Sequence, residues 1–426
     1  MRVFLTGATG FIGGHLLDAL LANGHQVTCA VRRPGCIRRA GTSEVVVDFT
    51  RDHDAAIWAP RLDGIDAVIN AVGIIREDGT QTFDAIHHRA PVALFTACAD
   101  AGVGRVIQIS ANGADQQAAS RYHLSKKQAD DFLAALPVSA AIAQPSVVYG
   151  ADGTSAAMFT TLASLPLSGL PGGGRQALQP VHIDDLVAVV MRLLVESGPY
   201  VLDKRIPVVG PVPLTLRSFL AELGRAMGLR RRLVFPVPMP IVRLGARLAG
   251  KLPGSLLDPE TLAMLERGNT ADPEPATTLL GRALKPVAEF ISAAEREPVR
   301  QRAQLNWLLP LLRVSIALVW IVTGAVSLGL YPVEDSYALL ARVGIDGRLA
   351  PLLLYGAALM DFAIGIAILV VRRRRWLWCL QLVVILFYTA VITWTMPEFW
   401  LHPYGPLLKN LPMLAAILML MEMEKD

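Results

Sequence analysis

The sequence predicts an α/β domain with a Rossmann-like, doubly wound parallel sheet and a small substrate lobe, followed by an all-α bundle of four transmembrane helices. Two observations carry this prediction. A glycine-rich turn at residues 6–13 lies between a short apolar run and a stretch with helical spacing. After about residue 305, long apolar segments account for much of the 53% hydrophobic content. A chain of 426 residues also exceeds what one core usually holds, so we expect two or three domains.

The glycine-rich turn has the surroundings that a dinucleotide-binding motif needs. Residues 2–5 form an expected strand, and residues 14–22 have helical spacing. In such a unit the first glycine permits a tight turn, the second lets the backbone approach a pyrophosphate, and the third lets the helix pack closely. The pyrophosphate would lie on the N–H groups at the helix N-terminus. The residues expected to bind the cofactor here are Gly7, Thr9, Gly10, Phe11, Ile12 and Gly13. An ordinary glycine-rich turn is the plainer interpretation, and the flanking strand and helix count against it.

Further strands are expected at residues 26–31, 44–48 and 67–70, and at the end of residues 102–110. Helical stretches such as residues 89–98 lie between them. Alternating βα units of this length predict a doubly wound parallel sheet.

The end of the second expected strand carries Arg32 and Arg33. In a NAD-specific fold, an acidic residue at this place binds the ribose 2′-hydroxyl, whereas arginines suit a 2′-phosphate. We therefore expect NADPH, with NAD as the second choice. Two solvated loop arginines are the alternative interpretation.

Tyr122 and Lys126 lie four residues apart, so on a helix they share one face. The ammonium and a nicotinamide cation would lower the pKa of the phenol, and Tyr122 would then exchange a proton with a carbonyl oxygen as hydride moves. Tyr-x-x-x-Lys alone is common on surface helices. Its position after the fifth strand makes it more specific.

Five features together resemble the extended or atypical short-chain dehydrogenases/reductases, over about residues 1–300. They are the glycine turn, residues 70–73, the Tyr122/Lys126 pair, and residues 144–150 and 179–186. The resemblance implies that Tyr122 is the acid/base, that Lys126 holds the ribose and lowers the pKa of Tyr122, and that a serine such as Ser110 polarises the substrate carbonyl. It further implies a set of cofactor-binding residues: Asp48 at the adenine, and Asn70, Ala71, Val72, Gly73, Lys126, Pro145, Ser146 and Val147.

One position departs from the family pattern. The family's serine or threonine normally lies one or two residues beyond Ser110, where this chain has Ala111 and Asn112. Three alternatives follow. Ser110 polarises the substrate carbonyl, Asn112 does so in its place, or the third catalytic group is missing. The sequence is most similar to the atypical branch that includes the nucleotide-binding accessory subunit of respiratory complex I, which is regarded as structural.

Residues 217–251 hold eight basic residues and one acidic residue. Arg243, Arg247 and Lys251 recur at a spacing of four beside apolar positions. This pattern predicts a basic amphipathic helix, which either lies on an anionic membrane surface or forms a lid with a solvated charged face.

Four apolar segments follow, at residues 307–330, 351–371, 376–396 and 407–421. The first three reach the span of about 20 residues that a bilayer core requires, and the fourth is short. Residues 305–424 resemble the DoxX-like membrane family, through the acidic Asp361 in the second segment and residues 402–410. Asp361 has either a helix-packing or a functional role. We therefore expect an NAD(P)-binding domain at residues 1–300, a linker at 301–306 and a DoxX-like transmembrane domain at 307–424.

Four arginines at residues 372–375 occupy a tight loop between two of these segments. The positive-inside rule makes that loop cytosolic, and counting spans puts the NAD(P)-binding domain on the same side. No signal peptide precedes the first strand. The expected location is a bacterial-type inner membrane, with several spans and the nucleotide-binding domain in the cytosol.

Composition excludes some classes of function. A net charge of +4 is too small to indicate a nucleic-acid partner. Cys29, Cys36, Cys98 and Cys379 lack metal-ligand spacing, so we expect reduced thiols and no metal.

Two functions fit the sequence. The first is a membrane-tethered NAD(P)H-dependent oxidoreductase that acts on a carbonyl of a lipophilic substrate, such as a quinone, sterol or lipid intermediate. The second is a non-catalytic NADPH sensor, or an assembly or accessory protein of a membrane complex. The intact Tyr122/Lys126 pair favours the first, and the residues after Ser110 favour the second.

Overall fold

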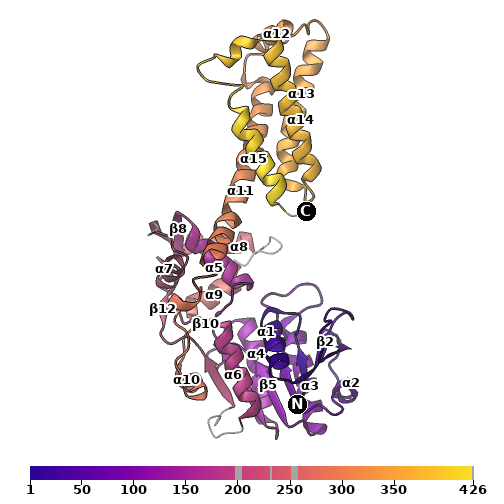
Figure 1. Cartoon of the computed structure of the whole chain (residues 1–426), viewed down its shortest axis with the longest axis vertical. Helices are drawn as coiled ribbons and strands as arrows, with labels where there is room; N and C mark the ends of the chain where they lie inside the picture. The colour runs from indigo at the N-terminus through magenta and orange to yellow at the C-terminus, as the bar shows by residue number, and fades with distance from the viewer. Residues whose placement is uncertain (197–203, 231–232, 251–257, 425–426) are drawn as a thin grey trace. The chain divides into compact units, whose positions relative to one another are not determined.

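A computed structural model describes residues 1–196, 204–230, 233–250 and 258–424 (Figure 1). The chain divides into two compact units, residues 1–303 and 304–426. Each unit is described by itself below.

The first unit is built on a parallel sheet whose strand order is β11-β6-β5-β4-β1-β2-β3. The chain leaves β1 towards one edge and then returns to β4 and continues towards the other, as in doubly wound folds. The prediction of a Rossmann-like sheet is therefore confirmed. The strands are β1 (Arg2–Thr6), β2 (Gln26–Val31), β3 (Thr42–Val46), β4 (Ala67–Asn70), β5 (Arg105–Ile109), β6 (Ala140–Pro145) and β11 (Arg205–Val208).

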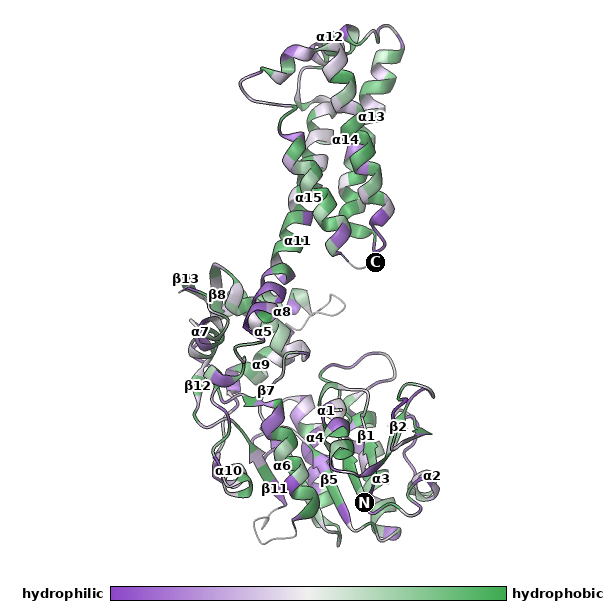
Figure 2. Cartoon of the chain, in the orientation of Figure 1, coloured by the Kyte–Doolittle hydropathy of each residue, from purple (hydrophilic) through white to green (hydrophobic). Residues whose placement is uncertain are grey.

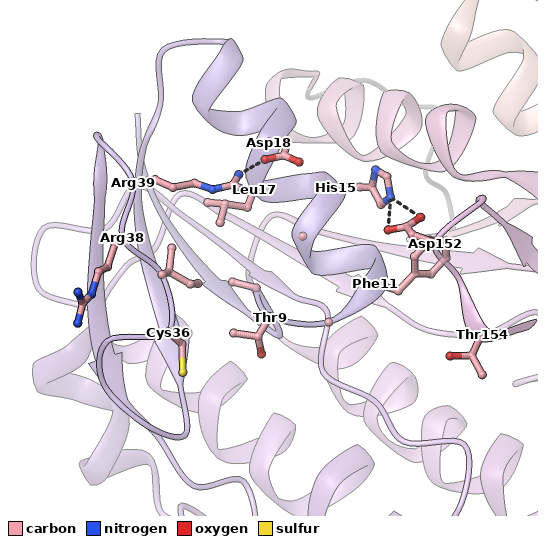
Figure 3. A pocket seen from close by; sticks show the side chains of 14 residues that line it. Thr9, Phe11, His15, Leu17, Asp18, Cys36, Arg38, Arg39, Asp152 and Thr154 are labelled. Carbon is pink, nitrogen blue, oxygen red and sulfur yellow. Dashed lines mark hydrogen bonds and ion pairs between the residues drawn. The ribbon is translucent and has the colours of Figure 1, made fainter. Parts of the chain in front are cut away.

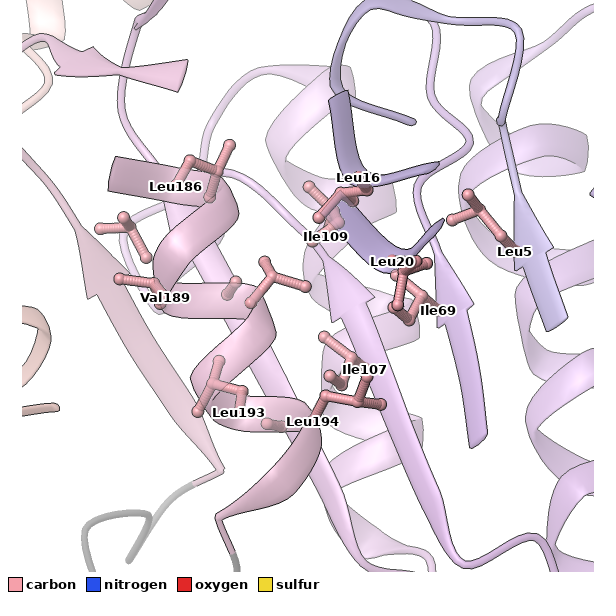
Figure 4. Packing of buried hydrophobic residues seen from close by; sticks show 14 of the residues in the cluster. Leu5, Leu16, Leu20, Ile69, Ile107, Ile109, Leu186, Val189, Leu193 and Leu194 are labelled. Atoms are coloured by element: carbon pink, nitrogen blue, oxygen red, sulfur yellow. The ribbon is translucent and has the colours of Figure 1, made fainter. Parts of the chain in front are cut away.

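Helices cover both faces of this sheet. Successive strand side chains point to opposite faces, so Leu5 joins one hydrophobic cluster and Phe4 the other. On the first face, Leu16, Leu20 and Leu193 pack against the strands (Figure 4). The helices on this face are α1 (Phe11–Ala22) and α6 (Ile183–Val195), and those on the other are α2 (Ala55–Trp58), α3 (Ala90–Asp100) and α4 (Arg121–Ala135).

A smaller lobe follows the sheet and has its own hydrophobic cluster, which includes Phe159, Leu170, Phe219 and Leu223. This is the expected substrate lobe. Its main elements are α5 (Thr154–Ser164), β8 (Leu167–Pro171), α7 (Leu216–Ala226), β13 (Leu233–Val237), α8 (Met239–Ala249) and α9 (Pro259–Arg267). Strands β8 and β13 pair in parallel, with Leu233 opposite Leu167.

Helix α8 coincides with the predicted basic amphipathic helix, although Lys251 lies outside the described residues. Its apolar side chains Ile241, Leu244 and Leu248 are each about 60% exposed. Arg243 pairs with Glu266 of α9 at 3.0 Å. An exposed apolar face on a basic helix is typical of helices that lie at a lipid surface.

The second unit is helical, and hydrophobic residues dominate its helices (Figure 2). Its helices are α11 (Arg296–Ala325), which starts in the first unit, the π-helical turn η4 (Val326–Leu330), α12 (Val333–Arg342), α13 (Leu349–Val370), α14 (Arg375–Thr395) and α15 (Asn410–Met423). Three of the described helices are long and apolar enough to cross a membrane, namely α11 with η4, α13 and α14. Helix α15 has 14 residues and is shorter.

Polar side chains of the second unit point into its interior. Trp320 donates a hydrogen bond from Nε1 to Gln381 Oε1 at 2.9 Å, and both residues are buried. Asp361 is 6% exposed, and its Oδ1 has no hydrogen-bond partner among the described residues. Asp361 therefore faces the interior of the bundle.

Candidate functional site

The turn between β1 and α1 fits the roles expected of two of its glycines. Gly7 has φ +73°, and a Cβ there would lie 2.8 Å from the carbonyl of Ala71. A Cβ on Gly13 would lie 2.0 Å from the carbonyl oxygen of Gly7. Gly10 is less confined, since its Cβ would meet that same oxygen at 3.2 Å. Gly7 and Gly13 thus close the turn, and Gly10 leaves its surface open.

A pocket of about 680 Å³ opens beside this turn (Figure 3). Its volume falls within the roughly 300–1,000 Å³ typical of ligand sites. It lies beyond the carboxyl ends of β1 and β2, where open α/β sheets bind nucleotides. The lining residues are Ala8, Thr9, Gly10, Phe11, Gly14, His15, Leu17, Asp18, Cys36, Ile37, Arg38, Arg39, Asp152 and Thr154.

Two polar pairs flank the pocket. His15 Nε2 lies 3.2 Å from both carboxylate oxygens of Asp152, which joins α1 to the start of the substrate lobe. Arg39 pairs with Asp18, so the loop after β2 is tied to α1 (Figure 3). The pocket is therefore framed by three separate segments of the chain.

The arginines of this pocket differ from the expected ones. Arg32 and Arg33 are exposed at the end of β2 and are not among the lining residues, whereas Arg38 and Arg39 are. Glu44 of β3 accepts hydrogen bonds from the N–H groups of Gly35 (2.6 Å) and Ile37 (2.5 Å), which fold the loop back. These same bonds lower the pKa of Glu44. The folded loop brings Arg38 and Arg39 to the pocket, and no residue pattern signals that.

Asp48 lies two residues beyond β3, which ends at Val46 rather than at Asp48 as expected. Its Oδ1 accepts hydrogen bonds from the Thr50 hydroxyl (2.7 Å) and the Thr50 N–H (2.9 Å). The hydroxyl bond is the main cause that lowers the pKa of Asp48. Asp48 is therefore an anion in the loop after β3, at the edge of the sheet formed by the carboxyl ends of the strands.

Asn70 is fully buried and links three strands. Its Oδ1 accepts from the Thr6 hydroxyl at 2.5 Å, and its Nδ2 donates to Gln108 Oε1 at 2.7 Å. The Thr6 hydroxyl in turn accepts from the N–H of Ala71 at 3.1 Å. Through Thr6, Asn70 thus helps to hold the backbone of Ala71 next to Gly7.

The segment after β6 is held in the same indirect way. The N–H of Asn112 donates to the carbonyl of Pro145 at 2.8 Å. The Ser146 hydroxyl donates to the carbonyl of Gln179, and the Ser146 N–H donates to the carbonyl of Val208 at 3.1 Å. Val147 is the next residue along the chain. Pro145 and Ser146 therefore order the backbone between the sheet and the substrate lobe.

Lys126 of α4 is buried and reaches the carboxyl ends of two strands. Its Nζ donates to the carbonyl of Ile109 at 3.1 Å and to that of Val72 at 3.4 Å. Burial lowers its pKa to about 8, and the charge of Asp130 opposes that shift. The ammonium thus stands at the edge of the sheet that carries the glycine turn.

Tyr122 lies one turn before Lys126, and its ring packs edge-on against Phe83 and His87, at 5.9 and 5.4 Å. Burial, followed by the charge of Asp130, raises the pKa of Tyr122 to about 12. Desolvation disfavours the phenolate in the protein without its cofactor, and the lowering expected beside a nicotinamide cation stays a prediction. At neutral pH the phenol carries its proton.

His87 was missed by sequence reasoning and is held in one tautomer. Its Nε2 accepts from the N–H of Ile74 at 2.9 Å, and its Nδ1 lies 3.0 Å from the Ser125 hydroxyl. Burial, helped by the charge of Lys126, lowers the pKa of His87 to about 2. His87 is thus a neutral ring that fixes the position of Tyr122. It lies on a π-helical turn, η2 (Asp84–Arg89), which the apolar pattern does not signal.

Ser110 points into the protein interior. It is 4% exposed, and its hydroxyl donates to Asp130 Oδ2 at 2.5 Å. Gln144 Nε2 donates to the same oxygen at 3.1 Å. Burial raises the pKa of Asp130 to about 7. Asn112 instead reaches the substrate lobe, where its Nδ2 donates to Asn269 Oδ1 at 2.6 Å.

Among the residues described, no group of three or more His, Cys, Asp or Glu side chains could hold a metal ion. Cys29 and Cys98 are buried free thiols, and Cys36 and Cys379 are exposed.

The two units match two families. Residues 3–201 match the NAD dependent epimerase/dehydratase family, and residues 317–418 match the DoxX-like family. The chain therefore carries an NAD(P)-binding domain of the epimerase and short-chain dehydrogenase/reductase type, followed by a DoxX-like membrane domain.

Several proteins from other organisms are similar to part of this chain. "NADH dehydrogenase [ubiquinone] 1 alpha subcomplex subunit 9, mitochondrial" of Arabidopsis thaliana is 29% identical over 274 residues, covering 60% of this chain and 65% of that protein. "Ceramide reductase" of Caulobacter vibrioides is 28% identical over 252 residues, with 54% and 72% covered. A Stigmatella aurantiaca "4-hydroxy-2-methyl-3-oxo-4-farnesyl-3,4-dihydroquinoline-1-oxide ketoreductase" is 25% identical over 284 residues, with 59% and 80% covered. The chain thus spans just under two thirds of the plant subunit.

Solved structures share the fold. A nucleoside-diphosphate-sugar epimerase from Staphylococcus aureus superposes with a TM-score of 0.55 at 18% identity, covering 68% of this chain and 99% of that one. The human epimerase family protein SDR39U1 (isoform 2), solved with NADPH, gives a TM-score of 0.53 at 21% identity, with 71% and 99% covered. At these identities the likeness establishes the architecture.

Proposed function

We propose that the protein is a membrane-tethered, NADPH-dependent reductase that transfers hydride to a carbonyl carbon of a lipophilic substrate. The observation that carries this proposal is the Tyr122/Lys126 pair. It places a protonated phenol and a buried ammonium on one helix face, at the carboxyl ends of β4 and β5. The same sheet edge carries the glycine turn.

The residues at the pocket fit a dinucleotide. Gly7 and Gly13 leave no room for a side chain, and α1 starts beside Gly10 with its first N–H groups towards the pocket. In this proposal Lys126 would bind a ribose and Asp48 an adenine; neither residue lines the pocket beside the glycine turn. The bound cofactor would supply the hydride.

The proton would come from Tyr122. Because its pKa is raised to about 12, the phenol is protonated at neutral pH and suits the role of general acid towards a carbonyl oxygen that gains negative charge. Lys126 would hold the ribose and stabilise the charge that develops on the phenol.

The sequence offers Ser110 or Asn112 as the third catalytic group, the one that polarises the substrate carbonyl. The Ser110 hydroxyl donates to buried Asp130, whereas the Asn112 amide faces the substrate lobe. We therefore assign Asn112 to the substrate carbonyl and give Ser110 a positioning role through Asp130. Ser110→Ala should then change kcat less than Asn112→Ala does.

We propose that four arginines together favour NADPH over NADH. Arg32 and Arg33 are the residues that the sequence predicts to bind the 2′-phosphate. Arg38 and Arg39 line the pocket itself. Fluorescence titration with both cofactors should give tighter NADPH binding, and Arg38→Ala or Arg39→Ala should reduce that preference. Equal affinity of the parent protein for NADPH and NADH would contradict this part.

The lipophilic substrate is proposed on two grounds. The DoxX-like domain puts candidate membrane-spanning helices on the same chain as the NAD(P)-binding domain. Two relatives are named for the reduction of a ceramide and of a farnesylated quinoline oxide. A quinone, sterol or lipid intermediate with a ketone fits both.

A second candidate is a non-catalytic NADPH-binding sensor or accessory protein of a membrane complex. The interior orientation of Ser110 favours it. So does the likeness to a protein named as a subunit of NADH dehydrogenase.

Complementation of a deletion strain separates the two candidates. For a reductase, Tyr122→Phe removes the proton donor, keeps the ring against His87, and should lower the rate by about 10²–10⁴ with NADPH affinity nearly unchanged. Gly10→Val should block the pyrophosphate and abolish function under both candidates. Full rescue by Tyr122→Phe, with none by Gly10→Val, would overturn the reductase proposal.

A further inference from the structure

The substrate lobe contains a second pocket, separate from the one beside the glycine turn. It has a volume of about 580 Å³ and lies between α5, β8, α7 and β13. None of the residues that line it lines the first pocket. Neither the proposed hydride transfer nor the cofactor uses it.

The floor of this second pocket is apolar. Ala163, Leu170 and Leu220 are buried in it, each less than 8% exposed. The Ser168 hydroxyl donates to the carbonyl of Leu162 at 3.2 Å, so it needs no partner from a ligand. An apolar floor of this kind accepts a hydrocarbon chain.

The lining residues include three arginines and no acidic residue. Arg217, Arg225 and Arg230 are all exposed, so their charges lie where the pocket meets solvent. Arg225 lies 3.9 Å from Glu222, at the outer limit of an ion pair. The combination of an apolar floor and a cationic mouth is complementary to an amphiphile with an anionic head group.

The outer face next to this pocket is apolar as well. Along β8 and β13, Ser168, Leu170 and Val234 line the pocket, while the alternate residues Leu167 and Leu233 point outward and are exposed. An exposed apolar patch on a soluble lobe marks a surface for lipid or protein.

Helix α11, which continues into a candidate membrane span, begins against this lobe. The Ser164 hydroxyl at the end of α5 donates to the carbonyl of Ala303 in α11 at 3.1 Å, and Arg296 Nε donates to the carbonyl of Ala226 at 3.1 Å. The helices α5 and α7 that wall the pocket thus hold the first turns of α11. The apolar run of the candidate span begins at Trp307, a few residues later along the same helix.

From these observations we propose that the second pocket binds an anionic phospholipid. One acyl chain lies between α5 and α7, and the phosphate meets Arg217, Arg225 and Arg230. Bound in this way, the lipid holds the substrate lobe at the bilayer surface. The exposed apolar face of α8 belongs to the same lobe and suits the same surface.

The test uses the full-length protein in phosphatidylcholine vesicles that contain a phosphatidylglycerol carrying a photoreactive group in its acyl chain. After illumination, cross-linked peptides are mapped by mass spectrometry. Cross-links should fall in α5, α7 and β8. A matching photoreactive phosphatidylcholine should label these peptides several-fold less.

Two variants and their matched controls locate the site. Ala221→Phe should fill the pocket from its exposed side and abolish this labelling, whereas Ala56→Phe on exposed α2 should leave it unchanged. Arg217→Ala should reduce labelling roughly fivefold, which corresponds to the ~1 kcal/mol that one basic residue contributes at an anionic lipid surface. Arg192→Ala removes an exposed arginine from α6 and should have no effect. NADPH binding by every variant reports that the first unit is folded.

Three results would overturn the proposal. They are equal labelling by the two lipids, labelling confined to residues 304–424, and labelling that persists in Ala221→Phe. Competition by inorganic phosphate alone would show a free-phosphate site instead of a lipid site. Because no result depends on turnover, a failure of the reductase proposal leaves this test intact.

Discussion

Lys126 and Asp130 lie one helical turn apart, and burial shifts their pKa values in opposite directions. The pKa of Lys126 is lowered to about 8 and that of Asp130 is raised to about 7, because desolvation disfavours both charged forms. Each charge partly offsets the shift of the other. Near neutral pH the protonation of this pair is therefore sensitive to small changes.

The first prediction concerns the pH dependence of cofactor binding. A lysine with a lowered pKa keeps its ammonium below that pKa and loses it as pH rises through about 8. If Lys126 holds the ribose, NADPH affinity should fall over that range. Fluorescence titration at a series of pH values measures the midpoint. Lys126→Arg should flatten the profile, because a guanidinium stays charged throughout.

Asp130→Asn is the matched change in the same pair. It removes the carboxylate that raises the pKa of Lys126, while the amide oxygen can still accept from Ser110. The alkaline midpoint should then move to lower pH. An unchanged midpoint in Asp130→Asn would show that the two groups do not interact as the structure indicates.

At the scale of helices, strands and turns, the sequence predicted those features that a local residue pattern determines. The glycine turn, the first five strands of the sheet and the Tyr122/Lys126 spacing all follow from short-range sequence. Arg38, Arg39 and His87 do not, because a loop folded back by Glu44 and a π-helical turn put them in place. The burial of the Ser110 hydroxyl against Asp130 also needs the tertiary structure, since one partner follows β5 and the other lies on α4.

The second prediction separates two glycines of one turn. An added methyl at Gly13 would lie 2.0 Å from the carbonyl oxygen of Gly7, whereas one at Gly10 would lie 3.2 Å from it. Gly13→Ala should therefore lower the free energy of unfolding by about 1–3 kcal/mol or more, as overpacking does. Gly10→Ala should cost less and chiefly weaken cofactor binding.

Thermal unfolding with and without NADPH measures both effects. A ligand that binds only the folded state raises Tm, so the parent protein should show that rise. Gly10→Val should unfold near the parent temperature without cofactor and lose the rise. Equal loss of Tm in the Gly10 and Gly13 variants would refute the assignment of separate roles.

At the scale of the whole molecule, ion pairs join three segments at one end of the helical unit. Glu424, at the end of α15, lies 2.7 Å from Arg313 of α11 and 3.7 Å from Arg374 of the loop between α13 and α14. The start of the bundle, the arginine loop and the C-terminal end thus meet at one end of the bundle. Hydropathy alone predicted the segments but not this contact.

The third prediction tests that contact. Glu424→Gln keeps the shape of the side chain and leaves two arginines without their anion. Because the side chains are 25% and 13% exposed in the closer pair, we expect a loss of about 1–2 kcal/mol of stability in detergent. Glu422→Gln, on an exposed residue two positions earlier, is the control and should be neutral. Equal effects of the two changes would rule out a specific role for Glu424.

The fourth prediction concerns orientation. Residues 372–375 carry four arginines, and the positive-inside rule places such a loop in the cytosol. Since Glu424 pairs with both Arg313 and Arg374, the start of the bundle and the C-terminal end should lie on that same side. Single cysteines are introduced after Cys29, Cys36, Cys98 and Cys379 have been replaced. In intact cells an impermeant maleimide should label Asp346→Cys and Tyr404→Cys, and should label Arg373→Cys only after permeabilisation. Labelling of Arg373→Cys from outside would reverse the orientation and put the NAD(P)-binding domain on the opposite side from cytosolic NADPH.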